Sequence, residues 1–302
     1  AVSEAQHRML RALACRTWRF FETFTNDTEN GLPPDNYQEN PSPVVATRTS
    51  PTNIGFALLA NLAAWDFGYL STETLVARTE QTLNALEKLE RYRGHFYNWY
   101  DTRTLKPLPR LYISSVDSGN LAVALILEAR GLEELADWNG LPPRWREGLH
   151  DTAAVVEETL DAAASGRTLA ALRRAVAHHT EAITDASPDL VSLAAMLREA
   201  DRDVAARLAE TEAAPEPVRI WMEAFRAQCR DLAREAEAHA DPAGRDREHD
   251  RRRGRLVALA ARCEALADLD LEFLYDRSRR LLALGYNVDT HRLDPGFYDL
   301  LA

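Results

Sequence analysis

SLAAMLREADRDVAARLAETEAA, residues 192 to 214, is the stretch that decides the fold class. Its leucines, alanines and methionine recur at three- and four-residue steps, with arginine, aspartate and glutamate between them. That spacing predicts a long amphipathic α-helix, because residues three and four apart share a helix face. TLAALRRAVAHHTEAI, residues 168 to 183, repeats the pattern. The middle of the chain therefore predicts several long helices, and their charged residues are expected to form solvated faces.

The bulk composition excludes several classes of protein. The chain has 302 residues, of which 46% are hydrophobic and 27% charged, enough for one large globular domain or two smaller ones. Its formal net charge of -11 opposes attraction to the phosphates of nucleic acid. Three distant cysteines and the adjacent His178 and His179 lack the spacing of metal ligands, so neither a metal nor a cofactor is expected. The most apolar run, residues 54 to 65, is too short for direct membrane insertion.

Capping signals place further helices before residue 140. Ser3 and Gln6 have capping-box spacing, and Ser50 stands before Pro51, which suits the first helical position. A third helix is expected to open at Ser71 or Thr72 and to stop at Gly94.

A fourth helix is expected to be capped by Asp117 or Ser118 and to end before Gly131. Ahead of it, the alternating stretches HFYNWY (95 to 100) and LYISSV (111 to 116) predict a short β-hairpin across DTRTLKPLPR. In such a strand His95, Tyr97 and Trp99 would share one face, with Phe96, Asn98 and Tyr100 on the other.

Four loops in this region mix aromatic and polar residues: LPPDNYQENP (32 to 41), TRTSPTN (47 to 53), GHFYNWYDT (94 to 102) and SSVDSGN (114 to 120). Loops at one end of a helical array converge, so these are expected to line one rim. Carboxylates and amides pair with sugar hydroxyls, and flat rings cover the C–H faces of a sugar, so the rim predicts a saccharide site. Single members also fit plain turn, cap or core roles. The predicted binding residues are Asp35, Tyr37, Gln38, Arg48, Asn53, His95, Tyr97, Asn98, Trp99, Tyr100, Asp117, Ser118 and Asn120.

Several longer motifs carry a family resemblance. LPPDNYQE, RTSPTNIG, LAAWDFGYLS, GHFYNWYDT, SVDSGNLA and LYDRSRRLLALGYNVDTHRLDPGFYDLLA resemble the central region of bacterial cyclic β-1,2-glucan synthases. The resemblance covers roughly residues 1 to 140 and 265 to 302. It implies a segment of a large inner-membrane glycosyltransferase, lying on the cytoplasmic side, whose central domain cyclises the glucan by transglycosylation. The implied partners are linear or cyclic β-1,2-glucan and the other domains of the parent synthase.

The resemblance also implies a fold and a domain plan. The expected fold is all-α, part of an (α/α)6 toroid-like array with a short hairpin and an inserted bundle of long helices. Residues 1–140 would begin the glycosidase-like domain, 141–268 would be the insertion, and 269–302 would return to that domain. The chain looks truncated inside DPGFYDLLA, where Asp294 and Pro295 are expected to open another helix.

The family resemblance implies that the catalytic carboxylates lie beyond Ala302. This fragment would then contribute only the walls of the substrate site. Should one lie within the chain, Glu39 and Asp101 are the candidates, because nearby Tyr37 or Trp99 would raise a carboxyl pKa toward that of a general acid. The alternative hypothesis is a helical scaffold that links the membrane glycosyltransferase and phosphorylase-like domains without catalysis of its own. A third, an independent helical adaptor, has only fold-level analogy behind it.

Overall fold

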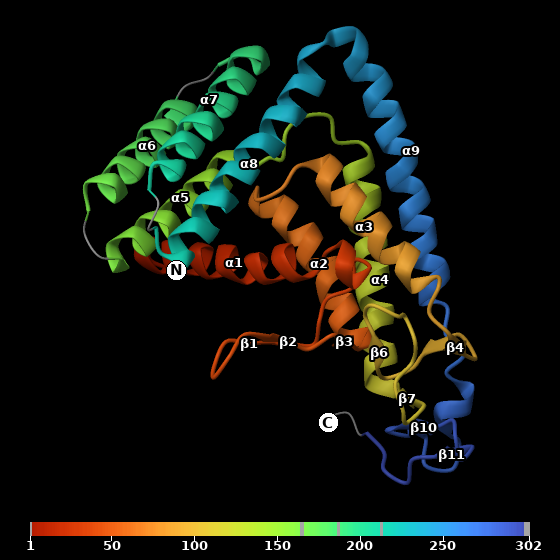
Figure 1. Cartoon of the computed structure of the whole chain (residues 1–302). Coiled ribbons are helices and arrows are strands. Elements are labelled where there is room, and N and C mark those ends of the chain that lie inside the picture. The colour runs from red at the N-terminus through yellow and green to blue at the C-terminus, as the bar shows by residue number, and fades with distance from the viewer. Residues whose placement is uncertain (1, 164–165, 186–187, 212–213, 299–302) are drawn as a thin grey trace. The chain divides into compact units, whose positions relative to one another are not determined.

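The computed structural model describes residues 2–163, 166–185, 188–211 and 214–298. This part of the chain is mostly helical, which confirms the predicted helical character (Figure 1). The α-helices are α1 (Glu4–Phe24), α2 (Pro51–Phe67), α3 (Thr72–Leu86), α4 (Ser115–Ala136), α5 (Trp145–Ala162), α6 (Arg167–Asp185), α7 (Leu190–Ala209), α8 (Glu216–Ala240) and α9 (Pro242–Ala267).

The chain divides into two compact units. Unit 1 comprises Ala1–Arg19, Ala63–Leu75 and Trp138–Arg252, and unit 2 comprises Phe20–Leu62, Val76–Asp137 and Arg253–Ala302. These units group residues by proximity, whereas the predicted domains follow composition and family resemblance. The domain boundaries therefore stay a prediction.

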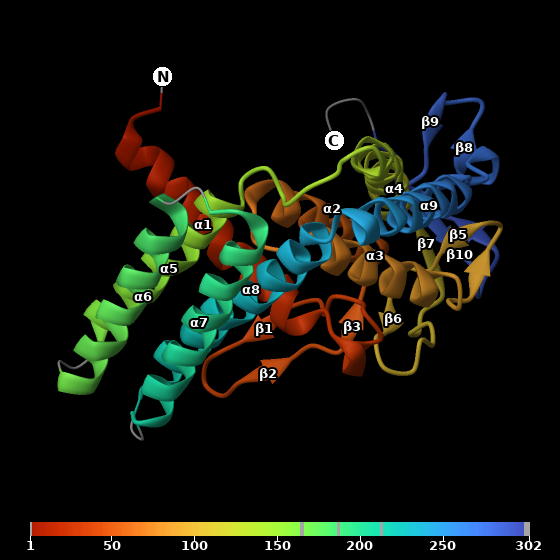
Figure 2. The same ribbon diagram turned by 90° about the horizontal axis from the view of Figure 1, so that it is seen from above.

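Unit 1 contains a four-helix bundle. Helices α5, α6, α7 and α8 each pack on the next, and α5 also packs on α8 (Figure 2). On α8, Val218, Met222, Phe225, Cys229 and Leu232 follow one another at three- and four-residue steps and are almost fully buried. The predicted long helices of the middle segment are confirmed, and this bundle core explains their spacing.

In unit 2, helix α2 packs closely against α4. A Cβ atom added to Gly55 would lie 2.9 Å from Ala124 Cβ, and one added to Gly131 would lie 2.3 Å from Leu62 Cδ2. Glycine therefore lets the two helices approach closely at two points, seven residues apart on each helix.

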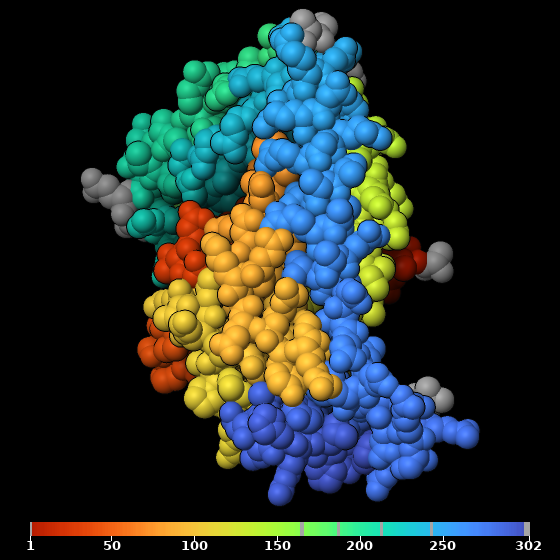
Figure 3. All heavy atoms as spheres, turned by 90° about the vertical axis from the view of Figure 1, so that its right-hand side faces the viewer, coloured from red at the N-terminus to blue at the C-terminus, as the bar shows by residue number. Residues whose placement is uncertain are grey.

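Helices α3 and α9 also run side by side within unit 2 (Figure 3). Arg255 donates to Glu80 (3.1 Å) and Arg262 to Asn84 (2.7 Å), each joining α9 to α3, and Arg262 also donates to Glu87 (2.7 Å) just after the end of α3. Arginines spaced seven apart lie on one side of α9, so these ion pairs form a row along the contact.

The strands of unit 2 are short. They are β1 (Tyr37–Gln38), β2 (Val44–Val45), β3 (Arg48–Thr49), β4 (Arg91–Tyr92), β5 (His95–Phe96), β6 (Tyr100–Asp101), β7 (Tyr112–Ser114), β8 (Tyr275–Asp276), β9 (Leu281–Leu282), β10 (Gly285–Asn287) and β11 (Arg292–Leu293). All pairings are antiparallel: β1 with β2, β3 with β6, β4 with β5, β8 with β9, and a three-stranded sheet in the order β11-β10-β7.

The predicted hairpin between HFYNWY and LYISSV is confirmed only in part: Asn98 N–H donates to the Tyr112 carbonyl (2.8 Å) and Tyr100 pairs with Pro107 in an isolated antiparallel bridge, but the strands within HFYNWY pair elsewhere. Its first two residues pair with β4 and its last residue pairs with β3, while LYISSV supplies β7 for the sheet with β10. The predicted alternation is wrong, because His95, Phe96 and Tyr97 are all buried. Alternation identifies extended chain, but the strand partner is set by segments far away in the sequence.

Helix starts follow the capping signals in three cases. Ser3 N–H donates to Gln6 Oε1 (2.9 Å) and Gln6 N–H to Ser3 Oγ (3.3 Å), the reciprocal pair of a capping box. Ser50 Oγ accepts from Asn53 N–H (3.2 Å) at the start of α2. Ser71 Oγ accepts from Thr74 N–H (3.1 Å) at the start of α3.

The predicted bounds of α4 are wrong at both ends. Ser114, not Asp117 or Ser118, is its N-cap and accepts from Asp117 N–H (3.1 Å). The helix continues through Gly131 to Ala136, because the glycine serves close packing there and not termination. The third helix likewise ends at Leu86, well before Gly94, which lies at φ +84° in the β4–β5 turn.

The C-terminal helix expected at Asp294 and Pro295 does not begin within residues 294–298. Phe297 pairs there with Ala283 in an isolated bridge. The rest of that predicted helix, residues 299–302, lies outside the described residues.

The described residues were compared with the requirements of a membrane-spanning helix and of a metal site. Over the described ranges, no helix has both the length and the apolar character that a membrane crossing requires. The same residues contain no grouping of three or more His, Cys, Asp or Glu side chains arranged to hold a metal ion.

Candidate functional site: a polar cluster at two helix starts

Strand β3 and the bend before β1 bring Arg48 and Asp35 together. Arg48 donates to Asp35 Oδ2 through Nε (3.1 Å) and Nη2 (2.9 Å), and the Asp35 N–H donates to the Arg48 carbonyl (2.7 Å). Asp35 Oδ1 accepts from Asn53 Nδ2 (3.3 Å), which joins this pair to the first turn of α2. The Arg48 side chain is 52% exposed and that of Asp35 19%.

The same arginine covers one face of Trp99. Arg48 pairs with Asp101 across the antiparallel strands β3 and β6, and its Cζ lies 4.6 Å from the ring centroid of Trp99, the residue just before β6. This is a cation–π contact. Only the other ring face remains for stacking on a ligand.

Asn98 joins Trp99 to the start of α4. Oriented by its partners, the Asn98 amide accepts from Trp99 Nε1 (3.0 Å) and donates to Asp117 Oδ2 (2.9 Å). Asp117 Oδ1 accepts from Thr52 Oγ1 (2.6 Å), and Thr52 in turn accepts from Asn120 Nδ2 (3.2 Å).

A continuous chain of contacts thus joins residues from all four predicted loops. We name it the polar cluster; its members are Asp35, Arg48, Thr52, Asn53, Asn98, Trp99, Asp117 and Asn120. All of them belong to unit 2. Seven are predicted site residues, and the structure brings these together.

Thr52 is the member that sequence reasoning missed. Its hydroxyl bridges α2 and α4 at the centre of the cluster, yet in the sequence it follows Pro51 as an ordinary first-turn residue. A signal existed, because a threonine in the first turn of a helix beside a predicted site loop has a hydroxyl available for a neighbour.

Four other predicted residues are buried beneath the surface. The His95 ring is fully buried, with Nε2 2.8 Å from the Asp270 carbonyl and Nδ1 2.8 Å from Ser118 Oγ. A carbonyl can only accept, so Nε2 carries the proton and Nδ1 accepts from the serine hydroxyl. Burial lowers the His95 pKa, which keeps this ring neutral.

Tyr97 and Tyr100 form the second buried pair. Tyr100 Oη donates to the Glu90 carbonyl (2.5 Å) and accepts from the Tyr97 N–H (2.7 Å). Burial raises the pKa of the Tyr100 hydroxyl, and Tyr97 is 4% exposed. With His95 and Ser118, these rings fix the backbone that presents Asn98 and Trp99.

The remaining predicted residues lie on or near the β1–β2 hairpin. Tyr37 packs its ring 4.7 Å from that of Phe24, while Gln38 and Glu39 are exposed. Contact with a ligand by these three stays a prediction.

Asp101 differs from the general acid that its aromatic neighbours predicted. Its Oδ1 accepts from the Thr104 N–H (2.7 Å), Thr104 Oγ1 (2.9 Å) and the Arg103 N–H (3.1 Å). Burial raises the Asp101 pKa, but these hydrogen bonds to the charged form outweigh it, and the pKa is lowered. The expected pKa rise is therefore wrong, and Asp101 is an ionised turn residue at neutral pH.

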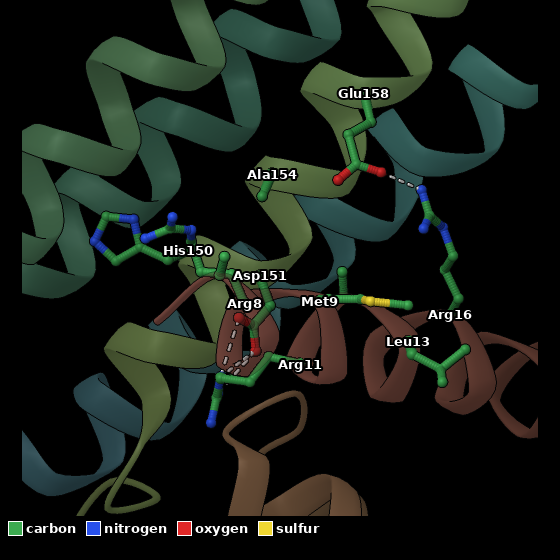
Figure 4. A pocket seen from close by; sticks show the side chains of 11 residues that line it. Arg8, Met9, Arg11, Leu13, Arg16, His150, Asp151, Ala154 and Glu158 are labelled. Atoms are coloured by element: carbon green, nitrogen blue, oxygen red, sulfur yellow. Dashed lines mark hydrogen bonds and ion pairs between the residues drawn. The ribbon is translucent and has the colours of Figure 1, made fainter. Parts of the chain in front are cut away.

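Unit 1 has a hollow of its own. A cavity of about 820 Å³ lies between α1 and α5, with Met9, Leu13 and Ala154 along its middle (Figure 4). Ion pairs between the two helices flank it: Arg11 with Asp151 (2.7 Å) and Arg16 with Glu158 (2.5 Å). None of the predicted site residues lines it, and these charged groups are already paired with each other.

Comparisons with known proteins agree with the motifs. No protein-family model matches the chain. Over 321 aligned positions it is 37% identical to the cyclic beta-(1,2)-glucan synthase NdvB of Rhizobium meliloti (strain 1021). The chain is homologous to cyclic β-(1,2)-glucan synthase. The alignment takes in 100% of this chain and 11% of the relative, so the chain corresponds to about one tenth of that synthase.

A solved structure from Bacteroides fragilis NCTC 9343, provisionally named a glucoamylase, is 24% identical and has a TM-score of 0.34. The match covers 42% of this chain and 32% of that one. A likeness of this size is too slight to assign a fold, so the toroid arrangement stays a prediction.

Proposed function

We propose that the polar cluster binds β-1,2-glucan and forms part of the wall of a domain that cyclises this glucan by transglycosylation in a cyclic β-1,2-glucan synthase. In this proposal the neighbours of the chain are the other domains of its parent synthase. The site of action is the cytoplasmic side of the bacterial inner membrane. The homology to the synthase supports the choice of glucan.

One observation carries the proposal: a tryptophan, three amide side chains and two carboxylates meet in one contact chain although they come from four separate loops. Asp117 uses two of its roughly four lone-pair positions on Thr52 and Asn98, so it can still accept from a sugar hydroxyl. The free face of Trp99 suits the C–H side of a glucose ring.

The cluster suits binding better than acid–base chemistry. A retaining glycosidase needs one carboxyl group as nucleophile and a second, protonated one as acid. Here Asp35 is paired with Arg48, and Asp117 accepts from Thr52 and Asn98, so each carboxyl group already has partners inside the cluster. We therefore assign this segment the role of holding glucan.

The test is calorimetric titration of the chain with linear β-1,2-glucan. Trp99→Ala is expected to weaken binding about tenfold, which corresponds to about 1.4 kcal/mol, because it removes the stacking face and releases Asn98. The matched control is Trp138→Ala: Trp138 is 37% exposed, holds two carbonyls through its Nε1 and belongs to unit 1.

Equal losses in the two variants would contradict the site. No binding by well-folded wild-type chain would remove the function and leave the scaffold hypothesis, which the separate core of the α5–α8 bundle favours.

A further inference from the structure

Helix α4 has an exposed apolar face. Val116, Val123, Ile126 and Leu127 are exposed by 42%, 57%, 49% and 50%. Positions 116, 120, 123 and 127 share one side of a helix, with 126 beside them. The opposite side is buried through residues such as Leu125. A helix that is apolar all round is typical of one enclosed by protein.

The face continues onto α2. Phe56 is 59% exposed and lies one turn after Thr52, so both are on the same side of α2. Thr52 accepts from Asn120, which lies between Val116 and Val123 on α4. Gly55 and Ala124 hold the two helices in close contact beside it. We name this surface the α2–α4 face; it consists of Phe56, Val116, Val123, Ile126 and Leu127.

We propose that an amphipathic helix from a part of the same polypeptide outside these 302 residues covers the α2–α4 face. The homologous synthase is about nine times as long as the aligned segment, which takes up 11% of it, so such a protein has ample chain to supply the helix. The occupant carries aliphatic side chains at three- and four-residue steps, which match the stripe on α4. It also reaches Asn120 at the edge of the polar cluster.

A second copy of the chain is the competing occupant. A segment joined covalently to its site has an effective concentration in the millimolar range, far above that of a second copy in dilute solution. The tethered helix therefore occupies the α2–α4 face in preference to a second copy wherever it is present. This inference does not require glucan binding.

The experiment measures maleimide labelling of Val123→Cys. The variant is made in the 302-residue chain and in a polypeptide extended at both ends by the sequence that flanks it in its gene. The native cysteines give little background, since Cys15, Cys229 and Cys263 are at most 3% exposed. Labelling is expected to be at least about tenfold slower in the extended polypeptide, because the covering helix must first open.

Ser42→Cys, on the exposed β1–β2 turn, is the matched control and is expected to react equally in both polypeptides. Equal rates for Val123→Cys in the two polypeptides, or equal slowing at both positions, overturn the proposal. Sedimentation of the 302-residue chain tests the competitor: a dimer that Leu127→Asp dissociates, with Val123→Cys already protected in it, would make the face a contact between copies.

Discussion

Glu128 is a fully buried carboxyl group in the middle of α4. Thr79 Oγ1 donates to its Oε1 (3.0 Å), while Oε2 has no hydrogen-bond partner among the described residues. Burial raises the Glu128 pKa to about 8 from an ordinary 4.5, against a smaller opposing effect of the threonine. The folded protein therefore holds a proton here that the unfolded chain releases.

This difference in pKa sets a pH dependence. The folded-state pKa lies above the unfolded value, so the contribution to stability is greatest below pH 4.5 and is lost as the pH rises to about 8. The free energy of unfolding of the wild type, measured with urea, is expected to fall by up to about 1.4 kcal/mol per pH unit in that window because of this group. Glu128→Gln removes the proton exchange, so its stability relative to wild type should increase with pH.

The control for this prediction is Glu133→Gln on the same helix, where the side chain is 43% exposed and paired with Arg130. Its profile should run parallel to that of the wild type. Parallel profiles for Glu128→Gln as well would contradict the buried, protonated carboxyl.

At the scale of single residues, the sequence predicted which polar side chains belong to the candidate site better than it predicted which side chains are buried. Asp35, Asn53 and Asp117 were identifiable because polar residues gathered at loops that lead into helices. The burial of His95 and Tyr100 could not be predicted in this way, since their hydrogen-bond partners are the carbonyls of Asp270 and Glu90, which lie outside the motif. For Asp101, the nearby rings suggested a raised pKa, but the local turn decides the direction.

Among the elements, the N-terminus of α3 has a cap supplied from α8. Asp231 accepts from the Ser71 N–H (2.7 Å), Ser71 Oγ (2.9 Å) and Thr74 Oγ1 (2.6 Å), all within unit 1. Glu235, one turn later, accepts from the Thr72 N–H (2.9 Å). Two carboxyl groups at this helix start accept from N–H groups that have no partner within the helix.

Asp231→Ala is therefore expected to destabilise the protein by about 1–3 kcal/mol, because it leaves the buried Ser71 N–H without its acceptor. The midpoint of urea unfolding, followed by circular dichroism, measures this loss. Glu237→Ala is the matched control on α8: its side chain is 45% exposed and pairs with an equally exposed Arg198, so the cost should stay below about 1 kcal/mol. Similar losses in the two variants would refute the capping role.

Capping residues in the sequence predicted the helix starts whose caps come from neighbouring residues. The reciprocal Ser3–Gln6 bonds and the Ser50 cap follow from spacing alone. Capping by Asp231 does not, because residues 160 positions apart make it. Most of the charged stretch from Asp241 to Gly254 lies inside α9, where pairs such as Arg251 with Glu248 support a helix. Strand partners were likewise set by distant segments.

For the molecule as a whole, the sequence indicated helices but not which helices share a core. The predicted domain plan set residues 141–268 apart from the rest, whereas unit 1 also takes in residues 1–19 and 63–75. Periodicity shows that a helix has an apolar side, but the partner of that side depends on tertiary packing.

Charge at the scale of the whole molecule gives a test that separates a neutral sugar from a charged ligand. The chain has a formal net charge of -11, and β-1,2-glucan carries no charge, so long-range electrostatics contributes nothing to their association. The dissociation constant for linear β-1,2-glucan is expected to change less than about twofold when salt rises from about 50 to about 500 mM. Titration calorimetry at both salt concentrations measures it. A tenfold loss of affinity with salt would mean that charge–charge contacts drive binding, in which case the polar cluster would recognise an anionic ligand through the exposed Arg48 and not a glucan through Trp99.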